Sequence, residues 1–213
     1  MSDRDEDGIA IGADGQPRCW WPGDDALYRR YHDEEWGRPV GDDRRLFEKL
    51  CLEGFQSGLS WLTILRKREN FRRAFAGFDA EAIVRFDEQD MDRLVSDPGI
   101  VRHRGKIEAV LTNARGFLDL VEKEGSFARF VWRFEPDPAS RPARITKAAV
   151  CAMATTKEST ALSKELRRRG WAFVGPTTAQ AFMQSMGLVN DHLDGCGVRA
   201  AVEAERAAFV RPS

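Results

Sequence analysis

Apolar residues recur at helical spacing through almost the whole chain from Cys19 onward, and this pattern constrains the fold more than any other feature. Apolar side chains three and four positions apart line one face of a helix, whereas a strand alternates apolar and polar residues. No stretch shows sustained alternation, and no internal repeat is visible. The sequence therefore predicts an all-α protein.

Capping residues and helix breakers divide this pattern into separate helices. Asp, Ser and Thr cap helix N-termini, whereas Gly and Pro stop helices. Four predicted helices begin at Asp42 or Asp43, at Ser60, at Asp79 and at Asp87, and a long helix that follows them ends at Gly125. Later helices are predicted over residues 127–134 and 159–169, and another is predicted to begin at Thr177 or Thr178. Residues 136–142 and 188–197 are predicted to be irregular.

The composition favours a globular protein over a membrane or secreted one. Hydrophobic residues make up 42% and charged residues 31% of the 213 positions, which supports a core and a solvated surface. The longest apolar run covers only residues 148–154, whereas a membrane span needs about 20 residues. No secretory leader is recognisable and the four cysteines are scattered, so we expect no membrane contact and a cytoplasmic location.

The net charge of −1 conceals an asymmetry along the chain. The first 14 residues carry a net charge of −4, which leaves +3 for the rest. Residues 1–17 have little to bury and are predicted to form a disordered acidic extension. Positive charge gathers in residues 66–73, 102–106 and 164–169. Such clusters are common on solvent-exposed helix faces, and they are also compatible with a nucleic-acid partner.

Two predicted helices within residues 87–125 are joined by the tight turn Asp97-Pro98-Gly99. A turn of this kind can present backbone N–H groups and a helix N-terminus to a phosphate, and a glycine permits close approach. The alternative is an ordinary helical hairpin without a ligand. The candidate DNA-contacting residues are Gly99, Arg102, Arg104 and Lys106.

The cysteines and histidines form two pairs, Cys19-x12-His32 and His192-x3-Cys196. Two Cys and two His suit tetrahedral Zn²⁺, and the second pair has the close spacing of structural zinc sites. A site built from both pairs would tie the two ends of the chain together. The alternative is that the pairs are unrelated, because a lone His is more often a core residue. Cys51 and Cys151 are predicted to be buried thiols.

Aromatic residues are unusually dense in the first third of the chain and accompany one carboxylate. They either pack against one another as part of the core or line a pocket for a flat heterocycle, as in enzymes that extract a base from the helix stack. The sequence contains no phosphate-binding glycine loop and no serine-hydrolase motif. The residues concerned are Trp20, Trp21, Tyr28, Tyr31, Trp36, Glu53 and Trp61.

These features and their flanking residues resemble the DNA-3-methyladenine glycosylase I family, a branch of the helix-hairpin-helix DNA glycosylases. The resembling stretches include YRRYHDEEWG at residues 28–37, LFEKLCLEGFQSGLSWLTILRKREN at 46–70, GIVRHRGK at 99–106 and FMQSMGLVNDHLDGC at 182–196. The resemblance spans roughly residues 18–196. It implies a helix-hairpin-helix glycosylase fold with two helical lobes and a zinc site that ties the N- and C-terminal segments together.

The resemblance also implies an activity. A member of this family flips 3-methyladenine out of double-stranded DNA and hydrolyses its N-glycosidic bond without cleaving the strand. We accordingly expect one glycosylase unit over residues 18–205, with its hairpin at about 87–125, a C-terminal tail over 206–213, and a monomer in solution. The competing hypothesis is a zinc-stapled helical module that binds DNA or senses damage without catalysis.

The family's functional residues transfer to matching positions in this sequence. A structural Zn²⁺ would be held within segments 19–32 and 192–196 by Cys19, His32, His192 and Cys196. Glu53 would be the catalytic and recognition carboxylate, and Trp61, Tyr28, Tyr31, Trp21 and Trp36 would bind the base. Two departures from the family pattern, Gln180 in place of an aromatic residue and Phe55 in place of Gln, could alter the pocket or the DNA contact.

Overall fold

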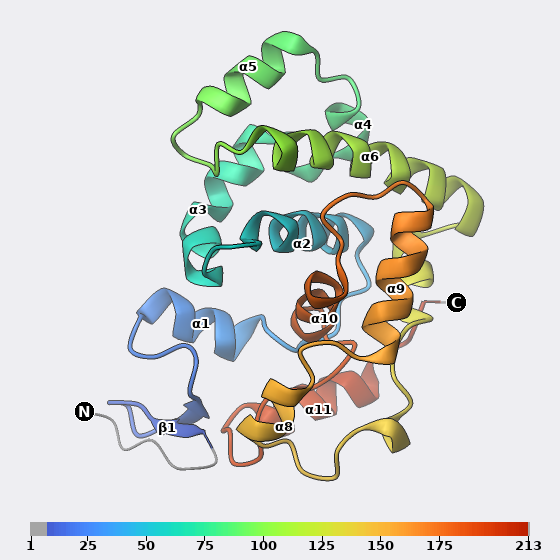
Figure 1. Cartoon of the computed structure of the whole chain (residues 1–213). Helices are drawn as coiled ribbons and strands as arrows, with labels where there is room; N and C mark the ends of the chain where they lie inside the picture. Colours follow the sequence, from blue (N-terminus) through green and yellow to red (C-terminus); the bar gives the residue numbers. More distant parts are fainter. Residues whose placement is uncertain (1–7, 213) are drawn as a thin grey trace.

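The computed structural model describes residues 8–212, and most of them lie in helices (Figure 1). The helical class predicted from the apolar spacing is therefore confirmed, with one addition. Strands β1 (Ile9–Ile11) and β2 (Pro17–Cys19) form a small antiparallel sheet in which Ile9 pairs with Cys19. Three-residue strands are too short to show sustained alternation, which is why the sequence pattern missed them.

Helix α2 (Asp43–Gln56) runs through the middle of the molecule and contacts α3 (Trp61–Ala74), α6 (Arg104–Glu124) and α10 (Pro176–Ser185) (Figure 1). Nine of its residues are buried: Leu46, Phe47, Lys49, Leu50, Cys51, Leu52, Glu53, Gly54 and Phe55. A helix buried on every side is normally apolar. The charges of Lys49 and Glu53 must therefore be paired with each other or with a ligand.

The helices that follow α2 gather at one end of the molecule, where α3, α4 (Ala80–Ile83), α5 (Glu88–Ser96) and α6 lie together (Figure 1). Four of the predicted caps are present, whereas the helix predicted to begin at Thr177 or Thr178 begins at Pro176 without a side-chain cap, and the one predicted over 159–169 begins at Lys157. The side chains of Asp42, Ser60, Asp79 and Asp87 each accept a hydrogen bond from a backbone N–H of the helix they precede. Helix α6 ends at Gly125, whose φ of +87° suits a residue without a Cβ.

The opposite end of the molecule brings together both ends of the chain. The β1–β2 sheet and helix α8 (Lys147–Ala152) lie there, with α11 (Arg199–Ala208) beside them (Figure 1). Helices α1 (Ala26–Glu34) and α9 (Lys157–Arg168) stand between this end and the middle, and α7 (Phe127–Trp132) packs on α2. In the described part of the chain, no helix is both long and apolar enough to cross a membrane.

The described parts of both predicted tails are structured. Residues 8–17, predicted to be disordered, contribute strand β1, whose Ile9 is buried with Cys19, Ile145, Leu193 and Cys196. The remainder of the predicted extension, residues 1–7, lies outside the described residues. At the other end, α11 continues past residue 205, and the Phe209 ring packs 4.7 Å from the Trp132 ring. Buried apolar contacts hold both segments, although the composition of residues 1–17 suggested little to bury.

Candidate active site and metal-binding cluster

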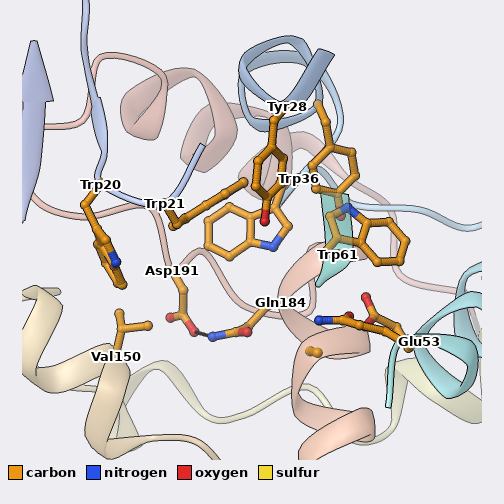
Figure 2. A pocket seen from close by; sticks show the side chains of 12 residues that line it. Trp20, Trp21, Tyr28, Trp36, Glu53, Trp61, Val150, Gln184 and Asp191 are labelled. Carbon is orange, nitrogen blue, oxygen red and sulfur yellow. Dashed lines mark hydrogen bonds between the residues drawn. The ribbon is translucent and has the colours of Figure 1, made fainter. Parts of the chain in front are cut away.

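A cavity of about 270 Å³ lies between α1, α2, α3 and α10 (Figure 2). This volume is at the small end of the range of ligand pockets and suits a small flat molecule. All six residues predicted to surround a base line it: Trp21, Tyr28, Tyr31, Trp36, Glu53 and Trp61. They come from α1 and the loops on either side of it, from α2 and from α3, so the cavity exists only because these helices pack together.

The aromatic residues both pack against one another and line the cavity. The Trp21 ring lies 4.9 Å from the Tyr28 ring and 5.2 Å from the Trp36 ring, at steep interplanar angles. Tyr31 and Trp61 make a second pair, with ring centroids 5.4 Å apart. Tilted and edge-to-face contacts of this kind hold the rings in place. The aromatic residues thus form a packed cluster that also lines a cavity.

Glu53 is held by a buried partner that the sequence analysis missed. The Lys49 Nζ atom lies 2.7 Å from the Glu53 Oε1 atom, and each residue is 5% exposed. The same Nζ donates to the Tyr31 hydroxyl at 2.9 Å and lies 3.1 Å from the centroid of the Trp61 ring. Burial lowers the pKa of Lys49 to about 8, and Glu53 opposes this shift. The i, i+4 spacing of two charges within a buried helix was the available signal.

Burial and the Glu53 carboxylate also act on the tyrosines of the pocket. Burial is the main cause that raises the pKa of Tyr28 to about 12 and that of Tyr31 well above its ordinary value. The negative charge of Glu53 is the second cause in both cases. Both hydroxyls therefore remain protonated at neutral pH. Around Glu53, the pocket wall therefore presents neutral phenols and indoles.

Trp20, which the sequence analysis grouped with these aromatic residues, also lines the cavity. Five further lining residues were not assigned to it: Gln56, Val150, Ala181, Gln184 and Asp191. Four of them come from the C-terminal half of the chain, where no aromatic cluster marks the sequence. The two family departures, in contrast, do not line it. Phe55 packs with its ring centroid 4.5 Å from that of Phe71, and Gln180 is buried and accepts a hydrogen bond from Thr156 at 3.1 Å.

The predicted hairpin consists of α5, the Asp97-Pro98-Gly99 turn and α6. Arg102 and Arg104 are exposed beside this turn. The Gly99 N–H donates to Asp97 Oδ1 at 2.7 Å, and its carbonyl accepts from Asn70 Nδ2 at 3.0 Å. A Cβ at Gly99 would lie 2.8 Å from Asp97 Oδ1 and 3.1 Å from Asn70 Nδ2, so the glycine is needed for packing against α3.

Lys106, predicted to contact DNA, points into the protein instead. It is 8% exposed, and its Nζ donates to the backbone carbonyls of Phe55 at 2.9 Å and Ser57 at 2.5 Å. These carbonyls lie at the C-terminal end of α2, where unpaired acceptors carry partial negative charge. Lys106 therefore holds α6 to α2, and its charge is not available to a phosphate. Its position in the first turn of α6, facing α2, is the reason.

The structure brings all four predicted ligands together in one buried cluster. The potential ligand atoms of Cys19, His32, His192 and Cys196 all lie within 4.8 Å of one another. The His192 Nδ1 atom is 3.2 Å from His32 Nε2, 3.6 Å from Cys196 Sγ and 3.9 Å from Cys19 Sγ. Ligands bound tetrahedrally to zinc at its usual bond lengths lie about 3.3–3.8 Å apart, so the spacing fits.

The surroundings of the two histidines orient them toward a cation. His32 Nδ1 lies 2.7 Å from the Asp33 carboxylate, and His192 Nε2 lies 3.0 Å from the Trp36 carbonyl. Both partners accept hydrogen bonds, so these ring nitrogens carry the protons and the other two carry lone pairs. Two lone pairs that face each other at 3.2 Å repel unless a cation lies between them. The cluster can therefore hold a metal ion.

Of the two cysteines of the cluster, Cys196 supplies negative charge. The pKa of Cys196 lies well below its ordinary value because Cys19 donates a hydrogen bond to it, and the same contact raises the pKa of Cys19. The backbone N–H of Leu193 donates to Cys19 Sγ at 3.3 Å. Of the other two cysteines, Cys51 is buried as predicted, whereas Cys151 is exposed because its side of α8 faces solvent.

Comparison with known proteins agrees with this arrangement. The family model for methyladenine glycosylases matches residues 21–200. DNA-3-methyladenine glycosylase 1 of Escherichia coli (strain K12) is 48% identical over 181 residues, which cover 84% of this chain and 95% of the relative. The chain belongs to the methyladenine glycosylase family.

Solved structures of related proteins have the same fold. A crystal structure of a 3-methyladenine DNA glycosylase I matches with a TM-score of 0.77 and 49% identity, and covers 84% of this chain and 98% of that one. A second, of a variant of such an enzyme in complex with 3-methyladenine, matches with a TM-score of 0.76 and 36% identity, and covers 82% and 93% of the two chains. The similarity thus extends over nearly the whole length of each relative.

Proposed function

We infer that this chain is a DNA-3-methyladenine glycosylase, which removes 3-methyladenine from alkylated DNA by hydrolysing the N-glycosidic bond. One observation carries the assignment: a small aromatic pocket contains a buried carboxylate, in a chain of this family. A flat base fits between aromatic faces only after it has left the helix stack. The pocket therefore accounts for base flipping as well as for recognition.

The chemistry needs little from the enzyme beyond recognition. A 3-methylated adenine carries a positive charge, so it is already a good leaving group and requires little general-acid help. Glu53 accepts a hydrogen bond from the base and favours the cationic ring, while Trp61 and the tyrosines stack on it. Lys49 occupies Oε1 of Glu53 at 2.7 Å, which leaves Oε2 to receive the base.

The same geometry argues for base removal without strand cleavage. Cleavage by glycosylases of the bifunctional type requires a lysine that attacks the sugar. Among the described residues that line the pocket there is no lysine. Lys49 lies against Trp61 and is committed to Glu53 and Tyr31, so it is not free to reach a sugar carbon.

The metal of the Cys/His cluster is proposed to be Zn²⁺ with a structural role. Two thiolates and two imidazoles complete a tetrahedral shell and leave no position for a catalytic water. When bound, the ion supplies a crosslink between the N-terminal strand and the C-terminal loop. The cluster residues hold their ring orientations through Asp33 and the Trp36 carbonyl.

Contact with the DNA backbone is proposed at the hairpin. Arg102 and Arg104 are exposed at the start of α6, where the helix N-terminus adds partial positive charge. Contacts of this kind position the duplex without reading its sequence, and they weaken as salt rises. Gly99 contributes by packing the turn on α3 rather than by touching a phosphate.

The decisive experiment measures free base released from methylated duplex DNA by the purified protein. We expect free 3-methyladenine to accumulate with multiple turnovers, and the strand to remain intact until alkali or an abasic-site nuclease is added. A module that only binds or senses damage would retain the DNA and release no base. Strand breakage without alkali would contradict the monofunctional mechanism.

A further inference from the structure

Two polar side chains, those of Gln184 and Asp191, lie together in the wall of the pocket. Gln184 comes from α10, and Asp191 comes from the loop that leads to the metal cluster (Figure 2). The Gln184 Nε2 atom donates to Asp191 Oδ2 at 2.8 Å. The Asp191 side chain is completely buried, and its Oδ1 atom accepts a hydrogen bond from Arg141.

These contacts determine which end of the Gln184 amide remains free. A carboxylate only accepts hydrogen bonds, and an amide has one donating and one accepting end. The NH₂ group must therefore face Asp191, because the opposite orientation would bring two oxygens together. The carbonyl oxygen Oε1 is left as a fixed acceptor at the pocket wall, between Asp191 and Glu53 in the view of Figure 2.

The Asp191 carboxylate that fixes this amide is itself held in place by Arg141, and we call these three residues the Gln184–Asp191–Arg141 clamp. Arg141 always carries a positive charge and neutralises the buried Asp191, and it contacts Met153 through its second guanidinium nitrogen at 3.6 Å. Asp191 directly precedes the cluster residue His192. The orientation of Gln184 is therefore set by the tertiary structure rather than by a bound molecule.

We propose that Gln184 is a specificity-determining residue whose Oε1 accepts a hydrogen bond from the exocyclic amine of the flipped base, with Asp191 and Arg141 as its positioning residues. This inference rests on the proposed glycosylase function. The amine of an adenine-type base has two N–H groups, and Glu53 on α2 and Gln184 on α10 supply two acceptors. At the same position a guanine-type base presents a carbonyl oxygen.

An acceptor that faces another acceptor leaves both without a hydrogen bond in a buried site. The cost falls on the wrong base, because the correct base satisfies the same group. Gln184 therefore makes the pocket prefer 3-methyladenine to 3-methylguanine. The aromatic residues do not discriminate between these purines, since both present similar flat rings.

The test is the binding of the two free bases, 3-methyladenine and 3-methylguanine, to wild type and to Gln184→Met by titration calorimetry. Methionine keeps the length of the side chain and removes its hydrogen-bonding groups. We expect the affinity for 3-methyladenine to fall about 3- to 10-fold, the value of one neutral hydrogen bond, and the preference over 3-methylguanine to shrink by the same factor.

Gln56→Met is the matched control. Gln56 lines the same pocket, and among the described residues no hydrogen bond is found that fixes its side-chain amide. We expect this variant to keep the wild-type preference between the bases. An equal loss of preference in both variants would show that any amide in the pocket suffices, and would overturn the role of the fixed Gln184.

Asp191→Asn tests the orientation directly. The new amide can accept from Arg141 and donate to Gln184, which turns the Gln184 NH₂ group toward the pocket. The preference should then shift toward 3-methylguanine beyond that of Gln184→Met. If wild type fails to bind 3-methyladenine, the proposed function and this inference both fail. If wild type binds it and Gln184→Met keeps the full preference, this inference alone is wrong.

Discussion

The Cys/His cluster and the aromatic pocket share a wall, but they differ in how completely their polar groups are satisfied. Trp36 belongs to both, because its ring lines the pocket and its carbonyl accepts from His192. In the cluster, every ring nitrogen that faces away from the centre has a protein acceptor. In the pocket, Glu53 and Gln184 are each held at one end and left open at the other. A site whose outward-facing polar groups are all paired within the protein suits a permanently bound ion. A site that leaves some acceptors unpaired suits a ligand that binds and dissociates.

The two regions also respond differently to the loss of one residue. A metal ion held by the cluster would crosslink both chain ends and so contribute to folding of the whole protein. A pocket carboxylate contributes to binding, and it contributes to folding only through Lys49. The following predictions test this division.

Removal of a cluster ligand is expected to have the largest effect on stability. Cys196→Ser should abolish stoichiometric zinc and lower the free energy of unfolding by about 5 kcal/mol, which corresponds to a fall in Tm of about 10–20 °C for a protein of this size. Elemental analysis and thermal unfolding measure both effects.

Cys151→Ser is the control for this prediction. Cys151 is exposed on α8 and outside the cluster, so this variant should keep its zinc and its Tm. Wild-type protein purified without chelators and free of zinc would contradict the assignment of the metal.

Replacement of the pocket carboxylate is expected to reduce both binding and stability. Glu53→Gln should weaken 3-methyladenine binding about 10- to 150-fold, the cost of a lost charged hydrogen bond. It should also cost about 3 kcal/mol of stability, because Lys49 then remains buried without its counter-charge. Calorimetry with free base and urea unfolding separate the two losses.

The double variant Glu53→Gln with Lys49→Met discriminates between these causes. It should recover most of the stability, since no buried charge remains, and it should not recover base binding. If the double variant is as unstable as Glu53→Gln alone, the buried pair is not the source of the loss.

The last prediction is a pH dependence of stability. Burial lowers the pKa of Lys49 to about 8 in the folded protein, from an ordinary 10.5. Between these values the unfolded chain binds more protons, so the contribution of this group to stability increases as pH rises from about 8 to 10.5. The difference in unfolding free energy between wild type and Lys49→Met should rise over that interval. A difference that falls with pH would contradict the lowered pKa.

The residues that carry chemistry were predictable where the chemistry demands particular residue types. Zinc accepts few ligands, so Cys19, His32, His192 and Cys196 were recognisable as candidates despite their separation. The helix caps at Asp42 and Ser60 were equally clear, because they act on the next turn of the chain. Lys106 shows the limit of this approach. Its charge suggested a phosphate contact, but the direction of its side chain depends on α2, which lies 50 residues earlier.

Local interactions depend on residues that are neighbours along the chain, and they can therefore be predicted from the sequence. The helical class, the N-terminal caps of α2 to α5, the candidate ligands and the aromatic character of the pocket all belong to this group. Only the tertiary structure determines the Lys49–Glu53 pair, the Gln184–Asp191–Arg141 clamp and the burial of Lys106. Each of them depends on what surrounds the side chains once the helices have packed. Burial makes an unpaired charge or amide costly, and packing decides which partner each group finds.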